Sequence, residues 1–403
     1  NDNSKLNVDL PPQIHRINCT EPMYPDSLYL TKRHLAGYMP TYRSVLPSTI
    51  IPNWSFGTYA ACASIATDQP EALRVIGFAH ADGADYYDWL THYEPIIHRF
   101  VAVSEEIAAN IANLIPHRRQ DIETRPYAVE LPKNLQRNHS CHERPLQLIY
   151  AGRISEKQKR VSDLIRLIEA LDAAQVDFQF RIIGEGSDKG VLNKKIELLT
   201  PSLRRRVGLE DSISPEQMPG VWQSADIFIL VSDYEGTSIA MLEAMAYGCV
   251  PVVTKVSGTA AVIDPGRNGH LISVGDIKAM AQVIKQLDND RRQLAMMAQA
   301  AHQTVLERFT YEEYLDWFLE MVDDVWQQPP RSWPAKRPLL PQRLPPELPE
   351  LYQEIIAELS GQDIARYISS RRIVQAVGFK IATQPGFGWL SRLRGLGRRL
   401  LGG

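Results

Sequence analysis

Short apolar runs alternate with stretches of helical periodicity along most of the chain. The apolar runs have the length of strands, and the stretches between them repeat apolar residues three and four positions apart. We expect strands at residues 50–51, 73–79, 96–103, 146–151, 178–183, 226–231, 251–254 and 269–273. We expect helices at residues 57–67, 85–94, 104–114, 161–173, 237–247, 276–287, 290–307 and 311–326. Because strands that alternate with helices form parallel sheets, the pattern predicts an α/β fold.

The expected helix 237–247 has almost no polar surface. Its residues are apolar on every side except at Glu243, so we expect it to be covered on all sides and to end at Gly248. Glu235 lies on the loop before this helix. An ionised carboxylate in a buried place is costly unless a polar group meets it. Each glutamate alone fits either a functional acid or a buried acid satisfied by a backbone amide or an arginine.

The residues between the two glutamates favour a phosphate site. Gly236, Thr237 and Ser238 begin the helix, where free amides suit a phosphate. From Glu235 to Gly248 the chain reads EGTSIAMLEAMAYG. This run resembles the motif of the retaining glycosyltransferases of GT-B fold, in particular the large family 4, in which two glutamates precede Ala-Met-Ala-x-Gly. The resemblance implies two Rossmann-like domains and a nucleotide diphosphate sugar as the donor.

The resemblance also implies roles for single residues. Glu235 is expected to meet the hydroxyls of the donor sugar, the amides of Gly236 to Ser238 the distal phosphate, and Glu243 the ribose hydroxyls. His80 directly follows the expected strand 73–79, which is where ligands bind in open α/β sheets. In isolation His80 also fits a surface histidine, but family 4 enzymes tend to place a histidine after this strand, near the donor sugar.

Cations follow the expected strand 146–151. Arg153 comes directly after a glycine, and Lys159 stands just before the next helix, so the two cations fit a pyrophosphate clamp. A basic surface loop is the alternative. In the family pattern Gly-Arg is followed by Lys-Gly, which makes Lys159 the equivalent lysine. Lys157 remains a competing candidate for this lysine. Arg160 stands where the family often has glycine, and the loop is one residue longer than in the family pattern.

Two glycines follow the expected strand 178–183. A lone Gly-x-Gly is a weak nucleotide signal, but Gly184 and Gly186 occupy the position where the family's loop passes near the nucleoside. The segment 206–209 lies where the family's base-binding strand usually falls, and it lacks the usual aromatic residue. The sequence therefore leaves the base open.

Composition shifts divide the chain into four parts. We expect an N-terminal domain at residues 1–135 and a nucleotide-sugar-binding domain at residues 141–328. Residues 329–349 hold eight prolines, which favours an extended linker, and residues 350–403 form a basic tail. Nothing before residue 50 resembles the family's first strand and glycine-rich turn. The first domain is therefore expected either to be abbreviated or to belong to a shortened chain.

Charge and cysteine content exclude several classes of protein. A formal net charge of -3 gives no general attraction to nucleic acid. The cysteines are widely spaced, without a Cys-x-x-Cys pair, which argues against a zinc site or a disulfide scaffold and favours a reducing compartment. They are Cys19, Cys62, Cys141 and Cys249.

Basic residues concentrate in the tail. Between Trp389 and Leu401 the tryptophan and the leucines follow helical spacing, with arginines opposite. This pattern fits a helix that lies on an anionic membrane surface. A flexible basic tail is the alternative, because Gly395 and Gly397 each cost about 1 kcal/mol of helix propensity.

We therefore expect a cytoplasmic retaining glycosyltransferase, peripheral on the inner face of the membrane. It would move a sugar from a nucleotide diphosphate sugar to a glycan or lipid-linked acceptor. It would need no cofactor and no metal, because Arg153 and Lys159 would neutralise the leaving diphosphate. The alternative is a non-catalytic scaffold that binds sugar nucleotides or glycans.

Overall fold

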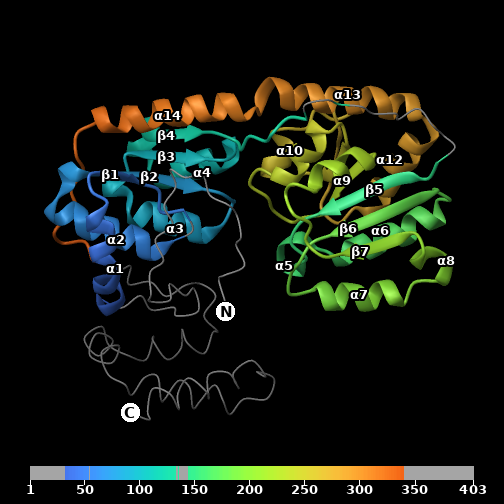
Figure 1. Ribbon diagram of the computed structural model, residues 1–403, viewed down its shortest axis with the longest axis horizontal. Coiled ribbons are helices and arrows are strands. Elements are labelled where there is room, and N and C mark those ends of the chain that lie inside the picture. The colour runs from blue at the N-terminus through green and yellow to red at the C-terminus, as the bar shows by residue number, and fades with distance from the viewer. Residues whose placement is uncertain (1–31, 54, 133–134, 136–143, 340–403) are drawn as a thin grey trace, which may run out of the picture. The chain divides into compact units, whose positions relative to one another are not determined.

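Two parallel β-sheets organise the part of the chain that the structure describes (Figure 1). The computed structural model describes residues 32–53, 55–132, 135 and 144–339, all of which lie in one compact unit. The first sheet has the order β1-β2-β3-β4, and the second has the order β10-β9-β8-β5-β6-β7. The first comprises β1 (Ser48–Ile50), β2 (Leu73–Ala79), β3 (Arg99–Ala102) and β4 (Ile122–Thr124). The second comprises β5 (Leu146–Ala151), β6 (Phe178–Ile183), β7 (Val207–Glu210), β8 (Ile227–Leu230), β9 (Val250–Thr254) and β10 (His270–Ile272).

Helices precede and connect the strands of the first sheet. They are α1 (Lys32–Ser44), α2 (Phe56–Asp68), α3 (Ala84–His92) and α4 (Glu105–Leu114), with short 3-10 turns η2 (Pro70–Ala72), η3 (Glu94–Ile96) and η4 (Pro116–Asp121). Strand β2 is buried along its whole length, as a central strand covered on both faces must be. Ser104 caps α4 as its sequence predicts, because its hydroxyl accepts a hydrogen bond from the amide of Ile107.

The second sheet is likewise covered by helices. They are α5 (Glu156–Lys159), α6 (Ser162–Ala173), α7 (Lys189–Glu197), α8 (Pro201–Arg204), α9 (Met218–Ser224), α10 (Ile239–Ala246), α11 (Ser257–Ala260), α12 (Ile277–Asn289) and α13 (Arg291–Arg308). Gly248 ends α10 in the left-handed region, with φ at 70°. The expectation that α10 is covered on all sides is wrong at its first residue, because Ile239 is 45% exposed.

The expected α/β class is confirmed, and most of the expected elements form. The strand expected at residues 96–103 is shorter, because the 3-10 turn η3, which contains Pro95, extends to Ile96 and the strand starts only at Arg99. The apolar residues Ile96 and Ile97 are still fully buried. Their apolar character therefore indicated burial correctly, but it did not indicate a strand. Strand β4 and helices α5, α7, α8, α9 and α11 were not expected.

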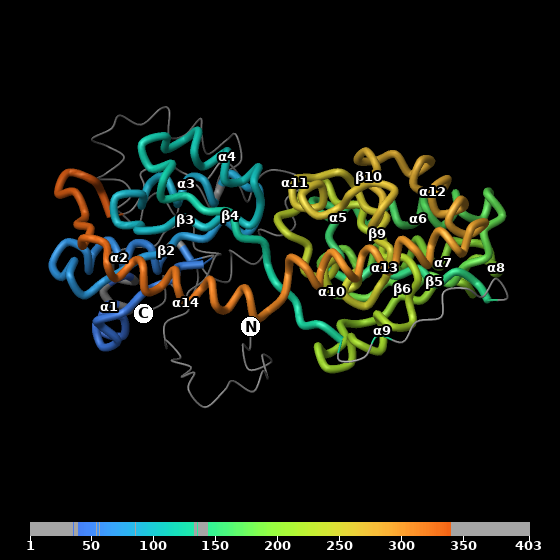
Figure 2. Tube along the Cα trace, turned by 90° about the horizontal axis from the view of Figure 1, so that it is seen from above, coloured from blue at the N-terminus to red at the C-terminus, as the bar shows by residue number. Residues whose placement is uncertain are grey.

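Helix α14 (Tyr311–Gln327) packs on the first sheet, although its sequence lies in the range 141–328 expected for the second domain (Figure 2). Met321 and Val325 of the helix form an apolar cluster with residues of β2 and β3. Arg74 of β2 fixes the end of the helix, because its Nε donates to the carbonyl of Val325 at 2.8 Å and its guanidinium lies over the ring of Trp326.

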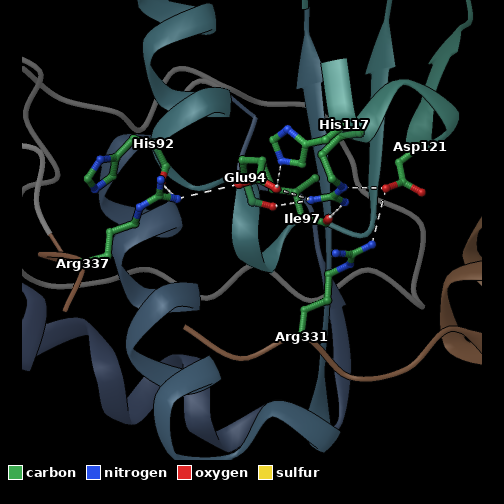
Figure 3. Close-up of polar contacts among 8 residues, drawn as sticks. His92, Glu94, Ile97, His117, Asp121, Arg331 and Arg337 are labelled. Atoms are coloured by element: carbon green, nitrogen blue, oxygen red, sulfur yellow. Dashed lines mark hydrogen bonds and ion pairs between the residues drawn. The ribbon is translucent and has the colours of Figure 1, made fainter. Parts of the chain in front are cut away.

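Residues 329–339 also dock on the first domain instead of forming a free linker (Figure 3). Trp333 is 6% exposed and packs against the ring of Tyr93. Arg331 lies 3.4 Å from a carboxylate oxygen of Asp121, and Arg337 lies 3.8 Å from one of Glu94. We call residues 329–339 the strap. The remaining expected linker residues, 340–349, and the tail 350–403 lie outside the described residues.

Candidate functional site

The loops after β5 and β8 meet where the strand order of the second sheet reverses. Strands β5, β6 and β7 run to one side and β8, β9 and β10 to the other, so β5 and β8 are the central pair. In open parallel sheets, ligands bind beyond the carboxyl ends of the strands at this switch point. Arg153 follows β5 and Glu235 follows β8. The topology therefore brings together two regions that the sequence predicted separately.

Lys159 and Glu235 form an ion pair at this point. The Lys159 ammonium lies 2.5 Å from Oε1 of Glu235, and the two side chains are only 13% and 7% exposed. Helix α5 holds the lysine in place through its neighbour Gln158, whose backbone carbonyl accepts from the amide of Asp233 and whose side chain donates to the carbonyl of Tyr234. The buried glutamate is thus satisfied by a lysine, one of the two cations expected at a phosphate.

The other basic residues of this loop lie differently. Arg153 is exposed, and its guanidinium donates to Oε1 of Gln158 at 2.5 Å. Lys157 is exposed as well. Arg160 adopts the left-handed conformation, with φ at 46°, and pairs with Asp163 and Asp233. This conformation explains why glycine would suit the position of Arg160.

The segment 236–238 packs closely against the backbone at His80 and at Gly258. A Cβ on Gly236 would stand 2.1 Å from the carbonyl oxygen of His80, and one on Gly258 would stand 1.1 Å from the carbonyl oxygen of Gly236. The Thr237 hydroxyl donates to the carbonyl of Val103 at 2.6 Å. Ser238 caps α10 by accepting from the amide of Met241. Glycine is therefore required at Gly236 for close packing, whether or not the amides meet a phosphate.

His80 lies next to this segment and is held by two polar partners. Its Nδ1 is hydrogen bonded to the hydroxyl of Tyr127, and its Nε2 lies 3.0 Å from Oδ1 of Asn53. The imidazole stacks on Phe78 and on Tyr127. Burial lowers the pKa of His80 below its usual value, which favours the neutral ring.

Glu243 is half-buried on α10. Burial raises the pKa of its carboxyl, while a hydrogen bond with the Trp222 side chain opposes that rise. Trp222 belongs to α9, an element that the sequence did not predict. The polar group that meets this carboxylate is thus an indole, whereas the sequence suggested a backbone amide or an arginine for a structural acid.

Gly184 and Gly186 allow the loops after β5 and β6 to touch. A Cβ on Gly184 would lie 1.9 Å from the carbonyl oxygen of Gly152, and one on Gly186 would lie 2.0 Å from that of Ile154. The amide of Ile154 also donates to the carbonyl of Glu185 at 2.8 Å. Both glycines therefore have a packing role, which leaves their expected approach to a nucleoside as a prediction.

A pocket of about 280 Å³ adjoins the loop that carries Glu235. Its lining residues are Asp82, Glu106, Asp233, Tyr234, Lys255, Val256, Ser257, Ala260 and Val274. They come from the loops and helices beyond both sheets, and Ser257 donates to the carbonyl of Glu235 at 2.8 Å. Lys255 and Asp82 belong to no motif and were not among the residues expected from the sequence. Their position after the carboxyl ends of strands was the signal that could have indicated them.

The described residues offer neither a metal site nor a membrane-spanning helix. No group of three or more His, Cys, Asp and Glu side chains there is arranged to hold a metal ion. The Asp-x-Asp pair of Asp288 and Asp290 is used structurally, since Asp288 pairs with Arg291 and Asp290 caps α13. Within the same part of the chain, no helix has the length and apolarity needed to cross a bilayer.

Comparison with known proteins finds related sequences. The family model for glycosyl transferases group 1 matches residues 133–304. The chain is 26% identical over 207 residues to N-acetyl-alpha-D-glucosaminyl L-malate synthase of Bacillus anthracis, covering 51% of this chain and 52% of that protein. It is 31% identical over 186 residues to the putative colanic acid biosynthesis glycosyltransferase WcaL of Escherichia coli, covering 42% of each. The chain thus spans about half the length of these relatives.

Solved structures share the fold. A TarM mutant of S. aureus, in complex with Fondaparinux, alpha-GlcNAc-glycerol and UDP, aligns with a TM-score of 0.61 at 20% identity, covering 73% of this chain and 59% of that one. Anabaena Alr3699/HepE, in complex with UDP, aligns with a TM-score of 0.61 at 16% identity, covering 72% and 82%. The chain therefore has the GT-B fold, and its residues 133–304 match the family model for glycosyl transferases group 1.

Proposed function

We propose that this protein is a retaining glycosyltransferase that moves a sugar from a nucleotide diphosphate sugar to a glycan or lipid-linked acceptor. The observation that carries the proposal is the Lys159–Glu235 ion pair at the switch point of the group 1 domain. A cation and a carboxylate in contact there can bind the diphosphate and the sugar of such a donor, respectively. The ammonium suits the diphosphate, and the carboxylate accepts from sugar hydroxyls.

Departure of the sugar leaves negative charge on the diphosphate, which the site must stabilise. Lys159 is fixed by α5 and by Glu235, and so is preorganised to meet that charge. Arg153 lies on the same loop, exposed, and five donors on its guanidinium suit bidentate contact with phosphate oxygens. We infer that these two cations act in place of a metal ion.

Donor and acceptor would meet beside His80. The pocket of about 280 Å³ has carboxylates of Asp82, Glu106 and Asp233 in its lining, and carboxylates are strong acceptors for the hydroxyls of a sugar. We infer that this pocket receives part of the sugar or the acceptor. TarM has been crystallised with UDP, and HepE with UDP and with UDP-glucose, which makes a uridine diphosphate sugar the first donor to test.

We further propose that the protein works in the cytoplasm, at the surface of the membrane. The support is the sequence of the basic tail, in which helical spacing would place arginines opposite Trp389 and the leucines. An acceptor linked to a lipid would be presented at that surface.

A panel of sugar nucleotides tests the proposed activity. Incubation of the full chain with each donor, with and without EDTA, should release nucleotide diphosphate from one class of donor, and the product should keep the anomeric configuration of the donor. Undiminished release in EDTA would support the metal-free mechanism. Binding of a donor without release of nucleotide would replace the proposal by the alternative, a non-catalytic scaffold for sugar nucleotides or glycans.

A further inference from the structure

Both ring nitrogens of His80 have a protein partner, and the partners come from different segments. Asn53, in the connection between β1 and α2, places Oδ1 3.0 Å from Nε2. Tyr127, in the segment after β4, places its hydroxyl against Nδ1. A carboxamide oxygen can only accept a hydrogen bond. Nε2 must therefore carry the proton, and Nδ1 of the neutral ring must accept from the phenol of Tyr127.

The chemistry of the two groups agrees with this assignment. Burial raises the pKa of Tyr127 far above its usual value, so the phenol keeps its proton and can donate. Burial also lowers the pKa of His80, so the imidazole stays neutral. The ring plane is fixed as well: Phe78 stacks at 5.5 Å and Tyr127 at 5.9 Å, with interplanar angles of 11° and 7°.

Tyr127 is itself anchored by the connection between the two sheets. Two residues further along, the amide of Val129 donates to the carbonyl of Phe309 at 3.0 Å, and Val129 bridges to Thr310. The chain leaves the first sheet at Val129 and returns towards it at Thr310. The pairing of these two connections therefore fixes the backbone that presents the phenol to His80.

We propose that Tyr127 is a positioning residue that holds His80 in its Nε2–H tautomer, so that the imidazole presents a hydrogen-bond donor to the ligand and does not act as a base. This inference rests on the proposed sugar transfer for its functional meaning. A hydroxyl oxygen of the sugar would accept from Nε2–H in place of Oδ1 of Asn53, whose side chain is exposed and can give way. His80 then orients the sugar without removing a proton from it.

The protonated nitrogen can be read directly in the full chain. With ¹⁵N-labelled imidazoles, long-range proton–nitrogen correlation identifies the tautomer of His80, whose signal is assigned by its loss in His80→Gln. We expect Nε2–H in the wild type. Tyr127→Phe keeps the stacked ring and removes only the hydroxyl; combined with Asn53→Ala, which removes the acceptor at Nε2, it should let the Nδ1–H form become populated. Asn53→Ala should leave Nε2–H dominant, because the phenol remains.

Kinetics separate positioning from a structural effect. Tyr127→Phe should lower kcat about tenfold and change the KM for the sugar nucleotide by less than about twofold. The reason is that the positioned N–H group of His80 acts on the reacting sugar. The matched control is Tyr93→Phe, which removes another phenol of the first domain, a buried one that donates to the carbonyl of Leu339 at 2.7 Å. It should change neither the tautomer of His80 nor kcat.

Three results would overturn the inference: an Nδ1–H tautomer in the wild type, an unchanged tautomer when Tyr127→Phe is combined with Asn53→Ala, or the same loss of Nε2–H when Tyr93→Phe is combined with Asn53→Ala. The spectrum needs no turnover, so it decides the inference even if no donor is cleaved. Failure of the proposed function would appear separately, as the absence of nucleotide release from the wild-type chain with every donor.

Discussion

At the scale of single residues, the site is built from charges that satisfy one another. Glu235 and Lys159 were predicted from separate motifs, yet each is the other's partner within the fold. Removing one member of a buried ion pair leaves the other charge without compensation, which is strongly destabilising. A loss of activity after such a change therefore has two sources, and only a variant that removes both charges separates them.

Lys159→Ala should cut transfer about tenfold or more, because one charge-assisted contact to phosphate is worth about 1.5 to 3 kcal/mol. It should also lower the free energy of unfolding, since Glu235 stays buried. The double variant Lys159→Met with Glu235→Gln should regain stability without regaining transfer. Lys157→Ala, an exposed lysine of the same helix, is the matched control. If Lys157→Ala abolishes transfer and Lys159→Ala does not, the assignment of the phosphate lysine is wrong.

The two glutamates should differ in what they recognise. Glu243→Gln is expected to weaken binding of free nucleotide diphosphate and of intact donor alike, because its proposed contact is to the ribose. Glu235→Gln is expected to weaken binding of the intact donor more, because its proposed contact is to the sugar. Titration calorimetry with both ligands measures the difference. Equal losses for both ligands in both variants would reject this division of roles.

His98 makes folding sensitive to acid. It is 1% exposed, its Nδ1 accepts from the amide of Val75, and burial, together with Arg331, Arg74 and Arg118, lowers its pKa to about 3. The folded pKa lies below the unfolded one, so the stability it contributes is present above pH ~6.5 and is lost as the pH falls towards ~3.

When the pH is lowered from ~7 to ~5, His98 should reduce the free energy of unfolding by about 2 kcal/mol. Denaturant titration of His98→Asn, in which Oδ1 can still accept from the amide of Val75, should show a pH dependence that is smaller by that amount. An identical dependence in both proteins would mean that other groups control acid stability.

At the scale of elements, long periodic segments were predictable and short ones were not. The sequence predicted α6 and α13 to within a few residues because their apolar faces repeat over several turns. Helix α5 has only Glu156–Lys159 and no apolar face, so nothing in its pattern marked it. Its interactions with Asp233 and Tyr234 are tertiary, and they place Lys159. The candidate site residues could thus be nominated from sequence, whereas their pairing, and the partners of His80, required the fold.

The strap shows why composition misled. Its prolines indicated an extended segment, and an extended backbone is compatible with docking when one side chain enters the core. Trp333 does so, and the guanidinium of Arg337 donates to the carbonyl of His92 at 3.2 Å (Figure 3). Since no periodicity announces a single buried tryptophan, the docking of residues 329–339 could not be read from the pattern.

Trp333→Ala should therefore destabilise the first domain by about 3 kcal/mol, the usual cost of deleting a buried aromatic side chain. Hydrogen exchange should rise in the strap and in α3 before it rises in the second sheet. Lys336→Ala, an exposed change in the same segment, serves as the control and should alter neither measurement. A variant at Trp333 with wild-type exchange would show that the strap contributes nothing to the stability of this domain.

At the scale of the whole chain, charge is distributed unevenly. Helix α14 carries Glu312, Glu313, Asp316, Glu320, Asp323 and Asp324 and no basic residue. From residue 361 onward the balance reverses, with eight arginines and lysines against Asp363 alone. A net charge of -3 therefore conceals a basic end that can approach an anionic surface while the rest of the chain is not attracted to it.

We therefore expect the full chain to bind vesicles that contain anionic lipid and to release them as salt rises, because the Debye length shrinks to about 3 Å at 1 M. Removal of residues 387–403 should abolish this binding and leave transfer to a soluble acceptor unchanged. Neutral vesicles are the matched control for the lipid charge. Replacing Arg392, Arg394, Arg398 and Arg399 by glutamine keeps the apolar residues and isolates the electrostatic part. If the truncated and full chains sediment equally with anionic vesicles, these residues are a solvated basic end, and the acceptor must reach the site by a route that does not depend on them.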